Sequence, residues 1–338
     1  MERPDLSDVS PEVPAYIDYL EAQLHSQESR GPAAATPEPS EPPTTVQLVT
    51  ISRSGQAKRT PRHFYGRQRR GGMGVFDLDV AEDDAPALLC LADAEDRLLL
   101  FSDAGRSFRI DVADLTEEPV RGRGTSLRSI LPLSDGESIV AALPANGGAN
   151  AILVRERGWV RRIRSSFFAG TLIPGTSFHD PASGGPLAAV CWAPGDADLF
   201  IATRQGLAIR FSESQVSGRS GALGLRVAPG DAVVGVTPVY EDSGVFLADG
   251  AGQGTIRLMS GFRPNRSPGA GGKQAMKSDE VIGAVTVTSA DDLFLISTLG
   301  KIIRFSAGDV PPKESAVQGV NCMSLRADST TALAVAHL

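Results

Sequence analysis

The stretch LFLISTLGKIIRF, residues 293–305, carries the pattern that decides the fold: an apolar run, a few polar residues, a glycine, and a short run with Arg or Lys. Five earlier segments repeat this pattern: LVTISRSGQAKR (48–59), LLLFSDAGRSFRI (98–110), AILVRERGWVRRI (151–163), LFIATRQGLAIRF (199–211) and VFLADGAGQGTIRL (245–258). Their glycines are Gly55, Gly105, Gly158, Gly206, Gly254 and Gly300, spaced 50, 53, 48, 48 and 46 residues apart. A period of about 49 residues indicates a repeat architecture.

Each of these segments predicts a β-hairpin, because Ile, Val, Leu and Phe favour strands and glycine suits the positive-φ position of a short turn. Further strands are predicted between the hairpins by SLRSILPL, SIVAAL, LAAVCWA, AVVGVTPV and VIGAVTV. Six units of four strands predict an all-β protein, a six-bladed β-propeller over residues 46–338. A two-layer sandwich fits less well, because nothing in a sandwich demands a constant period.

The composition agrees with this class of fold. The 338 residues are 41% hydrophobic, with 6% aromatic residues and 36 glycines, which suits short strands joined by tight turns. No apolar run reaches the roughly 18 residues of a membrane span, and no signal peptide is evident, so we expect a cytoplasmic protein without a membrane partner. Cys90, Cys191 and Cys322 lie far apart in apolar stretches and are expected to be buried hydrophobic residues.

Residues 1–45 differ from the rest of the chain. They hold nine of the acidic residues and only Arg3 and Arg30 as bases, which accounts for the net charge of -7 and leaves the remainder neutral. Ser10-Pro11-Glu12 and the apolar spacing that follows predict a short amphipathic helix at about residues 11–27. Five prolines between Pro32 and Pro43 predict an extended linker. This acidic tail is either a solvated segment or a helix that docks on a partner or on the propeller.

The basic residues outside the tail are clustered. The window from Arg53 to Gly72 holds seven Lys or Arg and no acid, and it includes RQRRGGMG, residues 67–74. Guanidinium groups beside glycines leave room for a bulky polyanion, since glycine has no Cβ, and phosphate is the expected ligand. We call residues 67–74 the box.

The box resembles the glutamine-arginine-arginine-glycine-glycine-lysine-glycine motif in the first blade of the C-terminal DNA-wrapping domain of the DNA gyrase A protein. Three other segments resemble loops of that family: GRGTSLRSILPLSDGESI (122–139), SGRSGALGLRVAPGDAVVGV (217–236) and VQGVNCMSL (317–325). The resemblance covers about residues 46–338. It implies a six-bladed β-pinwheel, in which blades exchange a strand, that bends duplex DNA around a basic rim. On this basis we expect a stand-alone, nucleoid-associated accessory of DNA gyrase or topoisomerase IV.

Equivalent loops of a propeller lie at equivalent places on its circumference, so separate basic clusters should add into one curved track that holds the DNA backbone without reading bases. The residues expected to bind DNA are Arg67, Gln68, Arg69, Arg70, Gly71, Gly72, Gly74, Lys58, Arg59, Arg62, Arg121, Arg123, Arg161, Arg162, Arg219, Arg263, Arg266 and Lys273. Met73 replaces the family's lysine, which removes one positive charge from the box.

No catalytic function is expected. The four tyrosines lack the setting of a topoisomerase nucleophile, and the chain contains no breakage-and-reunion portion or ATPase. The near-match to a P-loop, GAGGKQ (269–274), has Gln274 where a Ser or Thr would bind Mg²⁺. We therefore expect no cofactor, no metal site and no small-molecule substrate. The alternative function is a scaffold propeller that binds protein, which the missing lysine and the overall acidity favour.

Overall fold

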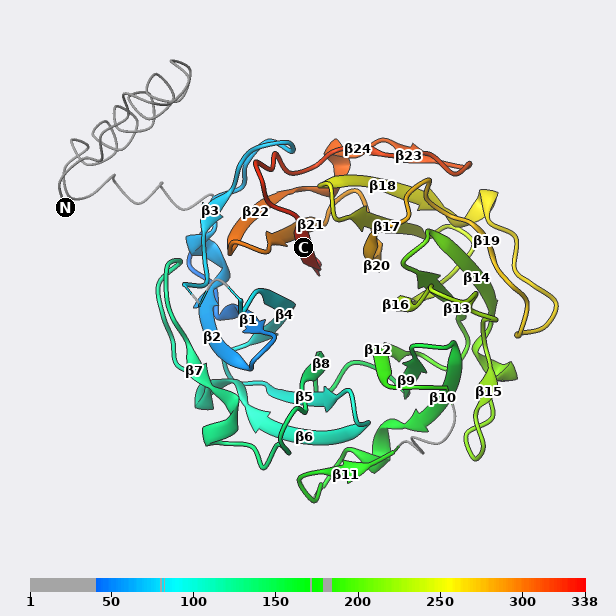
Figure 1. The fold of residues 1–338 in the computed structure, drawn as a ribbon, viewed down its shortest axis with the longest axis horizontal. Helices are drawn as coiled ribbons and strands as arrows, with labels where there is room; N and C mark the ends of the chain where they lie inside the picture. The colour runs from blue at the N-terminus through cyan, green and yellow to red at the C-terminus, as the bar shows by residue number, and fades with distance from the viewer. Residues whose placement is uncertain (1–40, 80, 82, 171, 179–183) are drawn as a thin grey trace, which may run out of the picture. The chain divides into compact units, whose positions relative to one another are not determined.

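The computed structural model describes residues 41–338 except 80, 82, 171 and 179–183. By contacts the chain divides into two units, Met1–Glu38 and Pro39–Leu338, and all described residues belong to the second. The helix expected at about residues 11–27 lies outside the described residues. The second unit is a ring of six sheets, as Figure 1 shows, and the predicted all-β six-bladed propeller is confirmed.

Each sheet, or blade, is built on one predicted hairpin. In order from blade 1 to blade 6 the hairpin strands are β1 (Val46–Ser52) with β2 (Gln56–Pro61), β5 (Arg97–Ser102) with β6 (Arg106–Asp111), β9 (Asn150–Arg155) with β10 (Trp159–Arg164), β13 (Asp198–Thr203) with β14 (Leu207–Ser212), β17 (Gly244–Asp249) with β18 (Gln253–Leu258), and β21 (Asp292–Ser297) with β22 (Lys301–Ser306). The first strand of each hairpin is buried on both faces; Leu98, Leu99, Leu100 and Phe101 are all 0% exposed. Neighbouring blades cover both faces, which explains the continuous apolar runs.

An inner strand completes the side of each blade that faces the ring centre (Figure 1). These strands are β4 (Pro86–Asp93), β8 (Ile139–Pro144), β12 (Leu187–Ala193), β16 (Val233–Val239), β20 (Val281–Val287) and β25 (Thr330–Ala336). All six line a cavity of about 200 Å³ whose walls are mostly Ala, Val, Leu and Gly. The inner strands β8, β12, β16 and β20 match the predicted apolar runs.

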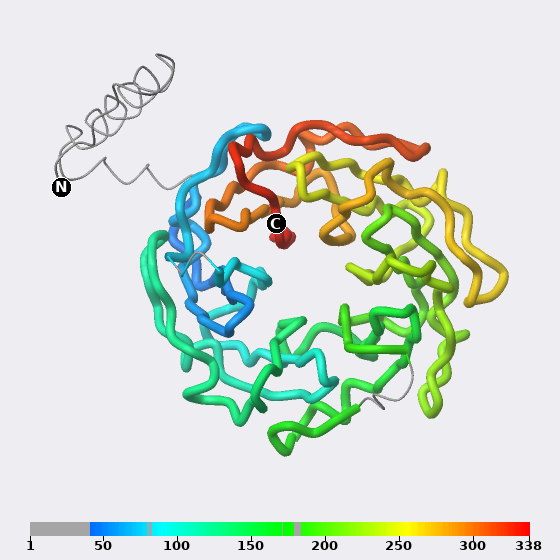
Figure 2. Tube along the Cα trace, in the orientation of Figure 1, coloured from blue at the N-terminus to red at the C-terminus, as the bar shows by residue number. Residues whose placement is uncertain are grey.

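The outermost strand of each blade comes from the next repeat. These short strands are β3 (Val75–Phe76), β7 (Thr125–Ser126), β11 (Thr176–Ser177), β15 (Ala222–Leu223), β19 (Lys273–Gln274), β23 (Pro312–Lys313) and β24 (Val320–Asn321). Thus β7 pairs with β2, β11 with β6, β15 with β10, β19 with β14, and both β23 and β24 with β18. Strand β3 of the first repeat pairs with β22 of the last and closes the ring, where blue and orange segments meet in Figure 2.

Single 3₁₀ turns follow the second hairpin strand of every repeat. They are η1 (Arg62–Phe64), η2 (Val112–Asp114), η4 (Ser165–Phe167), η5 (Glu213–Gln215), η6 (Met259–Gly261) and η7 (Ala307–Asp309), with an additional turn η3 (Leu127–Ser129) after β7. The segment SLRSILPL, predicted as a strand, starts at the last residue of β7 and otherwise forms η3 and irregular chain. Its Leu127 is buried between blades 1 and 2, so the apolar pattern reported burial and not strand geometry.

The prediction that Gly254 forms the turn of the fifth hairpin is wrong. The turn of the fifth hairpin uses Gly252, whose φ is +77° and whose N–H donates to the carbonyl of Asp249 at 3.0 Å. Gly254 lies inside β18, where a Cβ would meet the ring of Phe246 at 2.6 Å and the sulfur of Cys322 at 2.8 Å. Glycine is required at position 254 by this close packing, and the turn does not require it.

Candidate nucleic-acid interface

The box lies at the ring closure and is bonded to the end of the chain. The backbone N–H of Gln68 donates to the carbonyl of Arg304 at 2.7 Å, and that of Gly71 to the carbonyl of Cys322 at 2.7 Å. Gly72 forms a parallel bridge with Met323. Part of the box is therefore structural, and it joins the first repeat to the sixth.

Two of the three box arginines have partners within the propeller. Arg67 makes an ion pair with the buried carboxylate of Asp292 at 2.9 Å, and its side chain is 45% exposed. The Arg70 guanidinium donates to the carbonyls of Asp309 at 2.8 Å and Asn321 at 3.0 Å. Arg69 is exposed. Of the three, Arg69 is the best placed to reach a phosphate outside the molecule.

Gly74 permits the strand exchange that closes the ring. Its φ is +72°, and a Cβ would lie 2.4 Å from the carbonyl oxygen of Ile302 on β22. A positive-φ glycine precedes the outer strand in every repeat: Gly74, Gly124, Gly175, Gly221, Gly272 and Gly319. The glycines of the box thus allow two backbone segments to pack closely, in addition to any room that they leave for a ligand.

Lys58 is not available to DNA, and its prediction as a surface contact is wrong. Its ammonium makes an ion pair with Asp77 at 2.7 Å, and both side chains are 0% exposed. It also donates to the carbonyls of Pro119 and Val120, each at 2.9 Å. Burial lowers the pKa of Lys58, and the charge of Asp77 opposes that shift. A cation enclosed in this way holds the segments that follow β3 and η2 against β2.

Arginine at the fourth position after the turn glycine connects successive blades. Arg59 Nε donates to the carbonyl of Leu115 at 3.0 Å, directly after η2. The same contact recurs at the end of the next repeat's 3₁₀ turn for three more arginines: Arg109 to Phe168 at 3.2 Å, Arg210 to Phe262 at 3.3 Å, and Arg304 to Tyr65 at 3.1 Å. We call these four residues the clamp arginines. Arg59, which is also ion-paired with Glu117, is therefore mainly structural.

Glu41 joins two of the basic residues at the ring closure. It contacts Arg62 at 2.9 Å and the buried Arg304 at 2.8 Å, and Arg304 also pairs with Asp292 at 2.7 Å. Burial alone would raise the pKa of Glu41, but hydrogen bonds from Arg304 and Arg62 hold it below its ordinary value. Arg62, with only 12% of its side chain exposed, is thus committed to Glu41. No sequence pattern had singled out Glu41.

The remaining predicted cations lie on loops between the 3₁₀ turns and the outer strands. We call these the exchange loops: residues 65–74, 115–124, 168–175, 216–221, 262–272 and 310–319. Each leads into the outer strand of the preceding blade. Arg121, Arg123, Arg219, Arg263 and Arg266 on these loops are exposed, as is Lys273 at the start of β19. Lys273 donates to the carbonyl of Arg263 at 2.9 Å.

The charge of the exchange loops divides the rim into two parts. The loops on blades 3, 4 and 6 carry only basic charges: Arg219, then Arg263 and Arg266, then the three box arginines. The loop on blade 5 balances Lys313 with Glu314, and that on blade 1 balances two arginines with Glu117 and Glu118; the loop on blade 2 is uncharged. We call the rim from blade 3 to blade 6 the basic arc.

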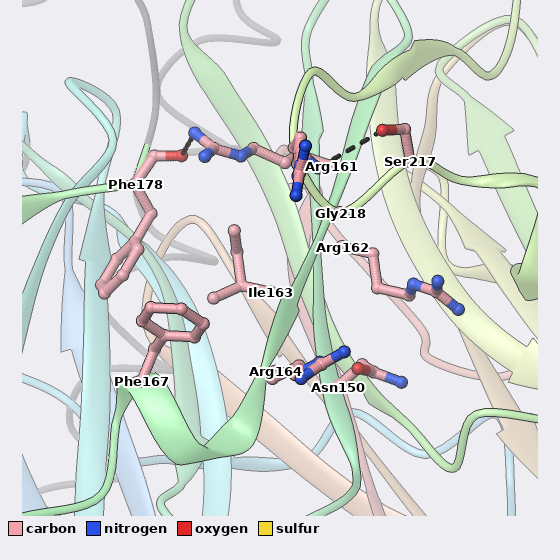
Figure 3. Close-up of a pocket in the computed structure, with 10 residues that line it drawn as sticks. Asn150, Arg161, Arg162, Ile163, Arg164, Phe167, Phe178, Ser217 and Gly218 are labelled. Carbon is pink, nitrogen blue, oxygen red and sulfur yellow. Dashed lines mark hydrogen bonds between the residues drawn. The ribbon is translucent and has the colours of Figure 1, made fainter.

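Arg161 and Arg162 lie on β10, at one end of this arc, in a cleft of about 660 Å³ that Arg219 also lines (Figure 3). Strand exchange brings Arg219 of the fourth repeat to blade 3, where a Cβ on the adjacent Gly218 would lie 3.5 Å from the carbonyl of Arg162. Arg164 and Phe167 also line the cleft. Neither was among the residues predicted from the sequence, although Arg164 ends the basic run of β10.

The described residues contain no group of three or more His, Cys, Asp or Glu side chains that could hold a metal ion. Within the same part of the chain, no helix is long and apolar enough to cross a membrane. Cys90, Cys191 and Cys322 are buried free thiols, as expected.

Exchanged outer strands and a closed ring of six blades define a β-pinwheel. The chain belongs to the family described as DNA gyrase C-terminal domain, beta-propeller, whose pattern matches residues 47–85, 96–146, 197–239 and 291–332, more than half of the chain. The resemblance stated from the box is therefore confirmed.

Individual relatives agree. The chain is 28% identical to the DNA gyrase A protein of Escherichia coli (strain K12) over 284 residues, which covers 81% of this chain and 32% of the relative. It is 29% identical to the DNA gyrase A protein of Lawsonia intracellularis over 291 residues, 82% of this chain and 36% of the relative. The chain thus spans about a third of the length of these relatives.

Solved structures support the fold. The structure of a DNA gyrase A C-terminal domain matches with a TM-score of 0.73 at 22% identity, covering 86% of this chain and 99% of that one. The C-terminal domain of a DNA topoisomerase IV matches with a TM-score of 0.62 at 19% identity, covering 87% and 94%.

Proposed function

We propose that this protein binds duplex DNA through its phosphates and bends it along the basic arc. The observation that carries the proposal is the placement of exposed cations from three separate repeats on the exchange loops of the basic arc, namely Arg219, Arg263, Arg266 and Arg69. Contacts spread over several blades can offset the cost of bending a duplex, which a single cluster cannot do. Because backbone contacts carry no base information, binding is expected to be independent of sequence.

Family membership supports a role in DNA topology. We infer that the protein is a non-catalytic accessory that presents a bent duplex to DNA gyrase or topoisomerase IV, at the nucleoid. The charge distribution limits the bent segment. The exchange loops of the adjacent blades 1 and 2 contribute no net positive charge, whereas within the basic arc only the loop of blade 5, which lies between two basic loops, is neutral. The duplex is therefore expected to leave the rim beyond blades 3 and 6, and a complete turn is not expected.

A mobility-shift titration of a duplex across a salt series tests binding. Replacing Arg263, Arg266 and Lys273 with Ala should make the slope of log K against log salt shallower by about 2.7, since each lost phosphate contact contributes about 0.9. Arg121 and Arg123, whose loop is electrically balanced, provide the control: their double Ala variant should change the slope much less. Equal slopes for all three proteins would remove the basic arc from the interface.

A substitution at position 73 of the box tests for a gain in DNA binding. Met73 is 53% exposed, so a lysine there would face solvent and could add a phosphate contact. Met73→Lys should steepen the salt slope by about 0.9. An unchanged slope would mean that DNA does not pass this part of the box.

Bending is tested by linking number. A relaxed closed-circular plasmid is saturated with protein, treated with a nicking-closing topoisomerase, and deproteinised. A shifted distribution of linking number is expected, and the Arg263, Arg266 and Lys273 variant should shift it less at equal occupancy. Tight binding without a shift would contradict bending.

A protein-binding scaffold is the second candidate. It is favoured by the number of cations in the window from Arg53 to Gly72 that the fold itself uses, namely Lys58, Arg59, Arg62, Arg67 and Arg70. Failure of the wild type to shift any duplex at low salt would favour it over DNA binding.

A further inference from the structure

The cleft on blade 3 brings together three arginines whose guanidinium groups have no hydrogen-bond or ion-pair partner among the described residues. Arg162 occupies the clamp position of this blade, yet among the described residues its guanidinium has no hydrogen-bond or ion-pair partner. The four clamp arginines, by contrast, each donate to the next repeat. The guanidinium groups of Arg164 and Arg219 likewise have no partner among the described residues. Three such groups in one cleft favour the binding of an anion.

The described residues that line the cleft include no acid to neutralise these arginines. Glu213, which contacts the cleft residue Asn150, is buried, and its two oxygens accept from Asn150 Nδ2 at 2.7 Å and from the N–H of Gly195 at 2.8 Å. Arg161 is oriented by the carbonyl of Phe178 at 2.6 Å, the dashed contact at the left of Figure 3. The cleft therefore carries a net positive field from its described lining.

The cleft also presents an aromatic surface. Phe167 is 63% exposed, and its ring meets that of Phe178 edge to face at a centroid distance of 6.5 Å. Phe178 packs in turn on the buried Phe168 at 4.7 Å. Figure 3 shows the two phenylalanine rings together on one side of the cleft and the Arg162 side chain on the other. An exposed ring held in place by packed rings is a ready platform for stacking.

A ligand that matches both sides of the cleft must carry an anion and a flat apolar face. The cleft volume, about 660 Å³, is in the range of sites that hold small organic ligands. Single-stranded nucleic acids are bound in this way elsewhere, by a basic groove for the backbone and aromatic side chains for the bases. A duplex cannot use Phe167, because its bases are stacked on one another and only its backbone faces the rim.

We propose that this cleft binds an unpaired nucleotide of a nucleic-acid strand, with the phosphate at Arg162, Arg164 and Arg219 and the base stacked on Phe167. The site shares Arg219 with the basic arc, but stacking of a base on Phe167 is a function that the duplex binding proposed above does not use. It would allow the propeller to hold a strand where the duplex has opened, at the end of the basic arc.

Fluorescence anisotropy with a short labelled oligothymidylate tests the site, beside an abasic strand of the same length and charge. The wild type should bind the thymidine strand more tightly than the abasic strand. Phe167→Ala should weaken binding of the thymidine strand by about fivefold or more, the typical contribution of one stacked base, and leave the abasic strand unaffected. Because Phe167 is exposed, this variant should fold normally, which its unfolding temperature checks.

The charge variants complete the design. Arg162→Ala with Arg219→Ala should weaken both strands, whereas the matched pair Arg263→Ala with Arg266→Ala, on blade 4, should leave the ratio of thymidine to abasic affinity unchanged. Equal affinity of the wild type for the two strands, or wild-type affinity in Phe167→Ala, would overturn the proposal. Equally tight binding of free thymidine triphosphate would assign the cleft to a free nucleotide and overturn the assignment to a strand. None of these results depends on whether the protein binds duplex DNA.

Discussion

Replacing Lys58 with Met separates a structural cation from a DNA-binding one. The change removes the ion pair with Asp77 and leaves that carboxylate enclosed, with hydroxyl donors from Thr50 and Tyr65 but without a counter-charge. Breaking one side of a buried pair costs about 3–5 kcal/mol. For a folded unit of this size that lowers the unfolding temperature by about 5–8 °C. Calorimetry and urea unfolding would measure the loss.

A double-mutant cycle sharpens this prediction. Asp77→Asn removes the charge and keeps one oxygen as the acceptor for Thr50 or Tyr65, while its NH₂ can donate to the other hydroxyl. Combining it with Lys58→Met should therefore recover part of the lost stability. A coupling of about 0.5–3 kcal/mol is expected for groups in direct contact. The salt slope of DNA binding should be the same for Lys58→Met as for the wild type. A stable Lys58→Met variant with a slope shallower by about 0.9 would refute the reasoning and return Lys58 to the DNA interface.

Three further outcomes are expected. Gly74→Ala should destabilise the protein by more than Gly136→Ala does, by urea unfolding, because both residues have positive φ but only at Gly74 would a Cβ meet a backbone carbonyl; equal losses would contradict the closure role. Glu41→Gln should remove stability that is present above about pH 4.5 and lost as the pH falls through the lowered pKa of Glu41, so the stability of the variant should depend less on acid pH; an unchanged pH profile would show that Glu41 is not ion-paired. Burial raises the pKa of Cys90 and of Cys322 to about 12 and also raises the pKa of Cys191. A thiol reagent at pH 8 should therefore label the three cysteines only after unfolding. Rapid labelling of the native protein would contradict their burial.

The fold could largely be predicted from the chain because each repeat contains the pattern of its own hairpin. A run such as Leu98–Phe101 with no polar interruption fits a strand covered on both faces, and the propeller supplies a neighbouring blade on each side. The two-residue outer strands escaped prediction, since a pair such as β7 is too short for any periodicity. Leu127 is a different case: it was predicted in a strand because its segment is apolar, but it lies in a 3₁₀ turn and its apolar character reflects burial between blades 1 and 2.

The candidate site was less predictable, because sequence shows where cations are but not what they face. Lys58 and Arg69 belong to the same basic window, yet one is enclosed with Asp77 and the other is exposed. Strand exchange brings Arg219 to the cleft of Arg162 from the next repeat. The exposed aromatic residue of that cleft, Phe167, carried no signal in a chain where most phenylalanines are buried.

By itself the sequence determined the period, the hairpins and the basic box, since these depend on local order along the chain: strand propensity, turn glycines and clustered arginines. Only the tertiary structure decided the division of labour among the cations. Closing the ring brings Glu41 and Arg304 together across 263 positions, and it buries one group of charges with partners while leaving another on the rim. Coulomb attraction and desolvation act through space, so the role of each arginine is set by the neighbours that the closed ring provides.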